Sequence, residues 1–154
     1  MSLDFNNFSP RANQVMVLAR KEAVRLNHEF VGTEHLFLGL IELGQGGAFD
    51  LLKKLGLNPD AVRQNVESLV VTSPPQKLTD NIPNIPYTPR LKKILHFAQH
   101  HAMVLRHPYV CTEDLLLGIM QEGDGVAARV LKQSKLTFDF LWNEIRSNDP
   151  GHRL

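Results

Sequence analysis

The 154-residue chain lacks several features that would assign it at once to a class of protein. It has a single cysteine, Cys111, which excludes an internal disulfide and fits a reducing compartment. No apolar run approaches the length of a membrane span, and the polar N-terminal residues lack the apolar core of a secretory signal. The formal net charge of +1 gives no attraction toward nucleic acid or an anionic membrane. The sequence therefore predicts a cytoplasmic protein with no nucleic-acid or membrane partner.

Catalytic signatures are equally scarce. The chain has no Gly-x-x-x-x-Gly-Lys-Ser/Thr loop, so it should not itself hydrolyse ATP. It has no Gly-x-Ser-x-Gly elbow of the esterase type. Nothing in the sequence supplies the base and electropositive pocket that would make Cys111 a nucleophile. An enzyme that uses Cys111 therefore has little support from the sequence.

The histidines are the remaining candidates for chemistry. His96 and His100 have the i, i+4 spacing that can hold a metal, but a partly exposed polar helix face that includes His101 explains them better. His28 and His107 each precede a helix, and we expect them to bond a nearby carbonyl in a structural role. The sequence thus predicts no metal site.

What the sequence does contain is an internal duplication. A constant shift of 79 positions, which takes Pro10 to Pro89, matches the two halves without an insertion between residues 8 and 57. The matched segments are Pro10-Arg11 with Pro89-Arg90, His28 with His107, Val31 with Val110, Thr33-Glu34 with Thr112-Glu113, Gly39 with Gly118, and Gly44-Gln45-Gly46 with Gly123-Asp124-Gly125. Two copies with so long a period indicate two similar lobes related by a pseudo-twofold axis, and not a solenoid.

The local signals in each copy are helical. Ser9 and Thr88 each offer an N-cap before a proline at the first helical position, and apolar residues then recur at spacings of three and four. Thr33 and Thr112 look like the N-caps of a second helix, with a glutamate in its first turn. A third helix over residues 48–55 and a fourth from Asn58 complete the repeat.

These signals predict an all-α fold of two pseudo-twofold-related four-helix repeats, about eight helices in all. The whole chain, 1–154, is expected to be one domain. Its predicted parts are repeat 1 over about 8–70, a proline-rich linker over 71–87, repeat 2 over about 88–147 and a flexible tail over 148–154.

The two Thr-Glu pairs have two interpretations, which the sequence leaves open. In the structural one, the threonine caps the helix and the glutamate stabilises the positive end of the helix dipole. In the functional one, the backbone N–H groups of the helix start bind an anion while the carboxylate beside them binds a guanidinium. A ligand that carries both a phosphate and a guanidinium would match both features.

The chain resembles the Clp N-terminal domain, the double-repeat helical module at the front of Clp AAA+ unfoldases, and the closest match is the ClpC type. The resemblance covers about residues 5 to 147 and rests on the paired segments FSPR with YTPR, VGTEHL with VCTEDL, and on the EGDGVAARVL run. It implies a domain that binds protein substrates and adaptor proteins and has no catalysis or cofactor of its own. ATP and magnesium would bind only in the ATPase domains of a full-length parent, whose ring feeds a ClpP-type protease.

Two further expectations follow from this resemblance. The isolated domain is expected to be monomeric. The alternative to an unfoldase module is a stand-alone accessory protein with the same fold, which would dock on a Clp protease complex and regulate it.

In part of the ClpC type, this domain also binds phosphoarginine, a degradation mark, at two symmetric sites. Carried over by position, the resemblance pairs Glu34 with Ser9 and Glu113 with Thr88, the glutamate for the guanidinium and the hydroxyl for the phosphate. The expected ligand-binding residues are Ser9, Thr33, Glu34, Thr88, Thr112 and Glu113.

The two copies differ within this segment. Cys111 stands where the first copy has Gly32, and it adds a side chain where glycine would let a ligand approach the backbone. Asp114 stands where the first copy has His35, and it adds negative charge near a site that should accept phosphate. We therefore expect the first-copy site, at Glu34, to be the stronger one.

Overall fold

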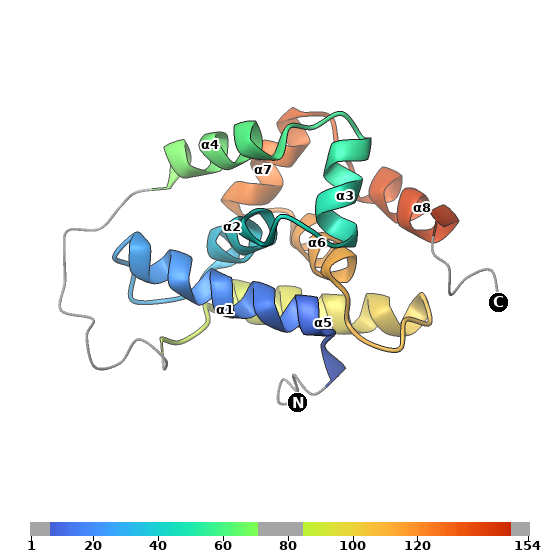
Figure 1. The fold of residues 1–154 in the computed structure, drawn as a ribbon, viewed down its shortest axis with the longest axis horizontal. Helices are drawn as coiled ribbons and strands as arrows, with labels where there is room; N and C mark the ends of the chain where they lie inside the picture. The colour runs from blue at the N-terminus through green and yellow to red at the C-terminus, as the bar shows by residue number, and fades with distance from the viewer. Residues whose placement is uncertain (1–6, 71–84, 149–154) are drawn as a thin grey trace.

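Eight α-helices make up the regular structure of residues 7–70 and 85–148, the parts of the chain that the computed structural model describes (Figure 1). They are α1 (Pro10–Arg25), α2 (Thr33–Leu43), α3 (Gly47–Lys54), α4 (Pro59–Leu69), α5 (Pro89–Val104), α6 (Thr112–Glu122), α7 (Val126–Gln133) and α8 (Phe138–Asn148). The predicted all-α fold of two four-helix repeats is confirmed. Most of the predicted linker and all but the start of the predicted tail lie outside the described residues.

The first helix of each repeat begins where local capping predicts. The Ser9 hydroxyl accepts a hydrogen bond from the N–H of Ala12, and the Thr88 hydroxyl accepts one from Leu91, each at 3.1 Å. Proline follows each cap at the first helical position. Within the described ranges, no helix has both the length and the apolar character needed to cross a membrane.

The second helix of each repeat forms the centre of the molecule. In Figure 1, α2 and α6 lie between α1 and α5 on one side and α3, α4 and α7 on the other. The apolar side chains of α2 that are buried are Leu36, Phe37, Leu38, Leu40 and Ile41, and they point to more than one side of the helix. A helix that is apolar on all sides has to be covered on all sides, which requires helices from both repeats. Accordingly α3 packs on α6, and α7 packs on α2 and α4.

The two repeats exchange their N-terminal segments. Residues 7–9 pair in parallel with Val110, which accepts a hydrogen bond from Ser9 N–H at 2.9 Å. In the same way Val31 accepts one from Thr88 N–H at 2.9 Å. The segment that starts each repeat therefore lies beside the start of the Thr-Glu helix of the other repeat.

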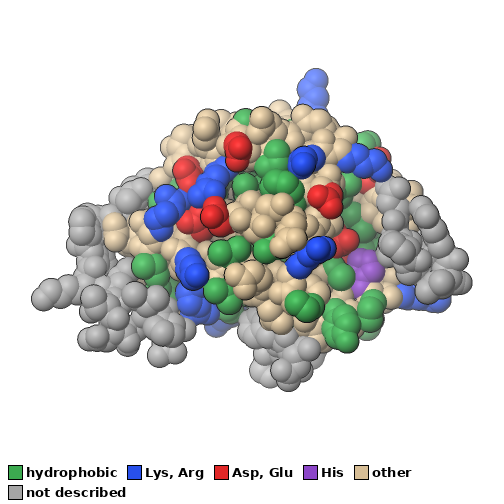
Figure 2. Space-filling model, in the orientation of Figure 1, with side chains coloured by type: hydrophobic (Ala, Val, Ile, Leu, Met, Phe, Trp, Pro, Cys, Tyr) green, Lys and Arg blue, Asp and Glu red, His purple; other side chains and the backbone are tan. Residues whose placement is uncertain are grey.

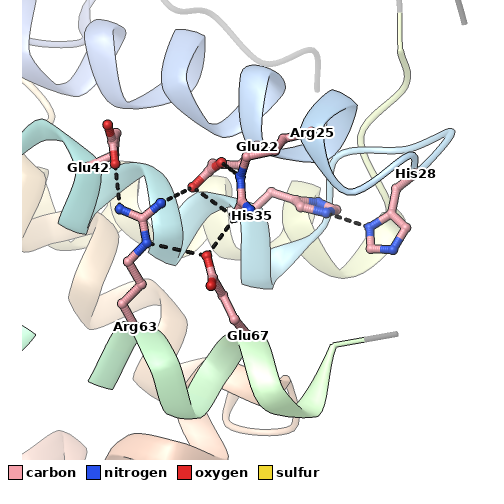
Figure 3. Close-up of polar contacts among 7 residues, drawn as sticks. All are labelled: Glu22, Arg25, His28, His35, Glu42, Arg63 and Glu67. Carbon is pink, nitrogen blue, oxygen red and sulfur yellow. Dashed lines mark hydrogen bonds and ion pairs between the residues drawn. The ribbon is translucent and has the colours of Figure 1, made fainter. Parts of the chain in front are cut away.

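An ionic network joins three helices of repeat 1 (Figure 3). Arg63 of α4 forms ion pairs with Glu22 of α1, at 3.1 Å, and with Glu42 of α2. Arg25 pairs with Glu22 at 2.6 Å and with Glu67 of α4. Glu22 is buried, so its two arginine partners offset the cost of removing its charge from water. On the face in Figure 2, acidic and basic side chains are likewise intermingled.

Repeat 2 has uncharged and aromatic side chains at the matching positions. His101 stands in place of Glu22, Gln121 in place of Glu42 and Trp142 in place of Arg63. His101 is buried, bonds Gln121 through Nε2, and lies 5.4 Å and 5.5 Å from the rings of Phe138 and Trp142. The prediction that His101 belongs to a partly exposed face is therefore wrong, because α8 covers it.

Candidate functional site

Two surface pockets contain the six residues that the sequence singled out. The first, called here the Glu34 pocket, has a volume of about 570 Å³. It is lined by Phe30, Gly32, Thr33, Glu34, Thr88, Pro89, Arg90, Lys93 and Glu122. The second, the Glu113 pocket, has a volume of about 430 Å³. It is lined by Ser9, Pro10, Arg11, Gly47, Cys111, Thr112 and Glu113.

Each pocket is built from both repeats. Glu34 shares its pocket with Thr88, and Glu113 shares its pocket with Ser9. The pairing carried over by position, Glu34 with Ser9 and Glu113 with Thr88, is therefore wrong. The reason is the exchange of N-terminal segments, which brings the N-terminal end of the first helix of each repeat to the start of the Thr-Glu helix of the other.

The threonines occupy the first helical position and not the N-cap. The N-caps of α2 and α6 are Gly32 and Cys111, so the predicted capping role of Thr33 and Thr112 is wrong by one residue. The Thr112 hydroxyl instead accepts a hydrogen bond from the N–H of Ala48, at 3.1 Å, in the first turn of α3. Thr33 packs against Gly125, just before α7, so closely that a Cβ there would overlap its hydroxyl. Both threonines thus join the two repeats beside the pockets.

In repeat 1, a histidine pair satisfies the backbone at the start of α2. The N–H of Gly32 donates to Nδ1 of His35 at 2.8 Å, and Nε2 of His35 lies 2.7 Å from Nδ1 of His28 (Figure 3). Because Nδ1 of His35 accepts, its proton is on Nε2, and His28 must accept through Nδ1. Burial, chiefly, and the nearby His28 and Arg25 lower the pKa of His35 to about 3. The pair works only while both rings are neutral.

In repeat 2, a histidine–carboxylate pair takes the same place. The N–H of Cys111 donates to Oδ2 of Asp114 at 2.8 Å, and His107 Nδ1 lies 2.8 Å from the same oxygen. Burial raises the pKa of Asp114, although the bonds from His107 and Cys111 oppose the shift. Asp114 is fully buried and does not line the Glu113 pocket, but it bonds the backbone of Cys111, which does line it. His28 and His107 do have structural roles, and both bond a side chain.

The two glutamates lie over different glycines. A Cβ on Gly32 would overlap the Glu34 carboxylate, and a Cβ on Gly47 would overlap the Glu113 carboxylate. The positions that match these glycines in the other repeat hold Cys111 and Val126. Glu34 lies against Gly32, and the matching position for Glu113 is filled by the side chain of Cys111. Glu113 lies against Gly47, and the matching position for Glu34 is filled by the side chain of Val126. The two carboxylates therefore take different positions in their pockets.

Two groups of described side chains have the geometry of a metal site, and neither includes the His96–His100 pair. They are His28, Glu34 and His35 in repeat 1, and His107, Cys111 and Asp114 in repeat 2. In both groups, the hydrogen bonds that start α2 or α6 already use the closest ligand atoms. His96 and His100 are exposed on α5.

Sequence reasoning missed the charged wall of the Glu34 pocket. Arg90 and Lys93 come from α5, and Glu122 comes from the end of α6. Arg90 belongs to the matched Pro-Arg pair at the start of each repeat, so the duplication did mark it. Lys93 and Glu122 have uncharged counterparts, Gln14 and Leu43, and the comparison of the two copies gave no reason to choose them.

Comparison with known proteins agrees with the fold and the repeat. The family model described as the Clp repeat (R) N-terminal domain matches residues 7–134. The negative regulator of genetic competence ClpC/MecB of Bacillus subtilis is 45% identical over 127 residues, which are 82% of this chain and 15% of that protein. An ATP-dependent Clp protease ATP-binding subunit ClpA homolog of Guillardia theta is 43% identical over 132 residues, 86% of this chain and 16% of its own length. The chain thus spans about one sixth of these relatives.

A solved structure has the same arrangement of helices. It is the N-terminal domain of the caseinolytic protease associated chaperone ClpD from Arabidopsis thaliana, which matches with a TM-score of 0.69 at 26% sequence identity. The match covers 92% of this chain and 94% of that one.

Proposed function

The chain belongs to the Clp repeat N-terminal domain family, and on this premise we propose that it is the substrate- and adaptor-binding module of a Clp ATP-dependent unfoldase. The module binds protein substrates and adaptor proteins in the cytoplasm and catalyses no reaction. ATP and magnesium bind in the ATPase domains of the parent, whose ring passes the substrate to a ClpP-type protease. The name of the Guillardia theta relative, an ATP-binding subunit of an ATP-dependent Clp protease, supports this proposal.

The alternative is a stand-alone accessory protein of the same fold that regulates a Clp protease complex. The reading frame of the natural gene separates the two. A phosphate-binding loop encoded beyond Leu154 supports the unfoldase module, and a stop codon directly after Leu154 supports the accessory protein.

Within either role, the two pockets are the proposed sites for phosphoarginine. The supporting observation is that each pocket combines a carboxylate from one repeat with a hydroxyl and a helix start from the other. The carboxylate of Glu34 or Glu113 suits a guanidinium. The first turn of α5 or α1, with Thr88 or Ser9 as its cap, suits a phosphate. The ligand would therefore bridge the two repeats.

Alanine at either glutamate tests this site. Because a hydrogen-bonded charge is lost, Glu34→Ala should weaken phosphoarginine binding at the Glu34 pocket by about 10- to 100-fold. Glu113→Ala should remove the weaker binding event at the second pocket. Isothermal calorimetry with free phosphoarginine measures both. Asp139→Ala is the matched control, because Asp139 lies in the first turn of α8 and lines neither pocket. Unchanged heats in both glutamate variants would refute phosphoarginine binding at these sites.

A further inference from the structure

The Glu34 pocket contains an ion pair between Arg90 and Glu122, whose counterparts in repeat 1 are Arg11 and Leu43. Nε of Arg90 lies 3.1 Å from Oε2 of Glu122, whose side chain is 7% exposed, while the side chain of Arg90 is 50% exposed. The other oxygen of Glu122 accepts a hydrogen bond from the N–H of Asp124 at 3.1 Å. Glu122 is thus fixed by the turn that follows α6, and it holds an arginine that reaches the pocket surface.

The pair leaves the outer edge of the guanidinium available. Among the described residues, the ion pair of Arg90 is made at Nε, and its two terminal nitrogens have no other ion pair. An arginine held at Nε presents the two terminal N–H groups as a fork, which matches two oxygens of a phosphate. Lys93, one turn along α5, adds a second positive charge to the same wall.

The Glu113 pocket has lost this arrangement. Arg11 matches Arg90, but Leu43 stands in place of Glu122, so Arg11 has no carboxylate at the matching position. Gln14 stands in place of Lys93. Within the described ranges, Arg11 takes part in no ion pair, and its side chain is exposed.

We propose that Glu122 is a positioning residue that fixes Arg90 as the phosphate-binding side chain of the Glu34 pocket, and that its absence makes the Glu113 pocket the weaker anion site. This inference rests on the proposed function for the identity of the ligand. It adds a residue that selects for the phosphorylated ligand: Glu34 alone would accept any guanidinium, whereas a fixed Arg90 with Lys93 requires the anion. An arginine without phosphate places its own positive charge near these two cations, and it should bind poorly.

Glu122→Gln is the most direct variant, because glutamine keeps an acceptor for the N–H of Asp124 and removes only the charge. We compare it with its parent in a Glu113→Ala background, so that only the Glu34 pocket binds. Calorimetry should show phosphoarginine binding weakened by about threefold to tenfold, since one positioned charge-assisted contact is loosened. Thermal unfolding of both proteins is measured alongside, and the melting temperature should not change.

The duplication supplies the reciprocal variant. In a Glu34→Ala background, Leu43→Glu places a carboxylate where Arg11 needs one, and phosphoarginine should bind the Glu113 pocket more tightly by a similar factor. Leu43→Gln is its control, because it adds the polarity without the charge. Leu43 is partly buried, so only variants that keep the cooperative unfolding of the parent are compared.

Two outcomes would overturn the inference: unchanged affinity in Glu122→Gln, or tighter binding, which would mean that Glu122 competes with the ligand for Arg90. A second measurement does not depend on phosphoarginine. In nuclear magnetic resonance spectra, titration with inorganic phosphate should shift the Nε–Hε signal of Arg90 in the unmutated protein, and the shift should be weaker in Glu122→Gln. Absence of that shift refutes the anion site. Its presence without phosphoarginine binding refutes only the proposed ligand.

Discussion

The free energy of unfolding should fall as the pH drops below about 6.5, and His35 should account for the largest share of the loss. Its pKa is 6.5 in the unfolded chain and about 3 in the fold, so the unfolded state binds the proton first. The stability that neutral His35 contributes is complete above pH 6.5 and is lost progressively as the pH falls toward 3. The slope for one such group is about 1.4 kcal/mol per pH unit. At pH 4.5, two units below 6.5, the loss is therefore ~3 kcal/mol.

The second repeat provides the variant that tests this prediction. His35→Asp gives α2 the same start as α6, where Asp114 accepts from both the N-cap N–H and a histidine. The variant lacks the imidazole whose pKa the fold lowers to about 3, so most of the acid loss should disappear. Urea unfolding at pH 7.5, 6.5, 5.5 and 4.5 gives the slope for each protein. A smaller slope should remain, because burial also lowers the pKa of His101. Equal slopes in the two proteins would contradict the role of His35.

Valine in place of Gly39 or Gly118 should destabilise the domain by ~3 kcal/mol or more, the upper range for an overpacked core. A Cβ on Gly39 would lie 2.8 Å from the carbonyl oxygen of Val15 and 3.0 Å from the N of Ala19. A Cβ on Gly118 would lie 2.7 Å from the carbonyl oxygen of Ile94. The obstacles are backbone atoms of α1 and α5, so no rotamer change can relieve them, and the paired helices must separate.

Urea unfolding of the valine variants measures this cost. Gln64→Val is the control, because Gln64 is exposed on α4, where valine brings its lower helix propensity without a packing clash. A loss of about 0.5 kcal/mol or less is expected there. If Gly39→Val and Gly118→Val were no less stable than the control, the close approach of α1 to α2 and of α5 to α6 would not be essential to the fold.

The helices could be predicted from the sequence because their signals are local. Ser9, Thr88 and Asn58 cap their own helices through neighbouring N–H groups, so a few residues contain the whole interaction. The same reasoning failed by one residue at Thr33, where glycine is the N-cap and the acceptor is His35. The Thr33 side chain instead packs against Gly125 of the other repeat, a contact that no local sequence pattern predicts.

The sites could be predicted only in part, for a related reason. The duplication identified Glu34 and Glu113, because their position relative to a helix start is local. Which hydroxyl lies opposite each glutamate depends on two contacts, the pairing of residues 7–9 with Val110 and that of Val31 with Thr88. The 79-position match does not show whether each N-terminal segment pairs with its own repeat or with the other one. Burial of Leu38 escaped prediction because it depends on how the other repeat covers α2.

The exchange of N-terminal segments bears on how such a chain could have arisen. A solitary half-length polypeptide would have no second repeat with which its N-terminal segment could pair as it does here. Two identical half-length chains could each pair their N-terminal segment with the other chain and so form both pockets, as in a domain-swapped homodimer. Joining such a dimer end to end reproduces the present architecture. In one joined chain, the two halves can accumulate different substitutions, as the matched positions Leu43 and Glu122 show.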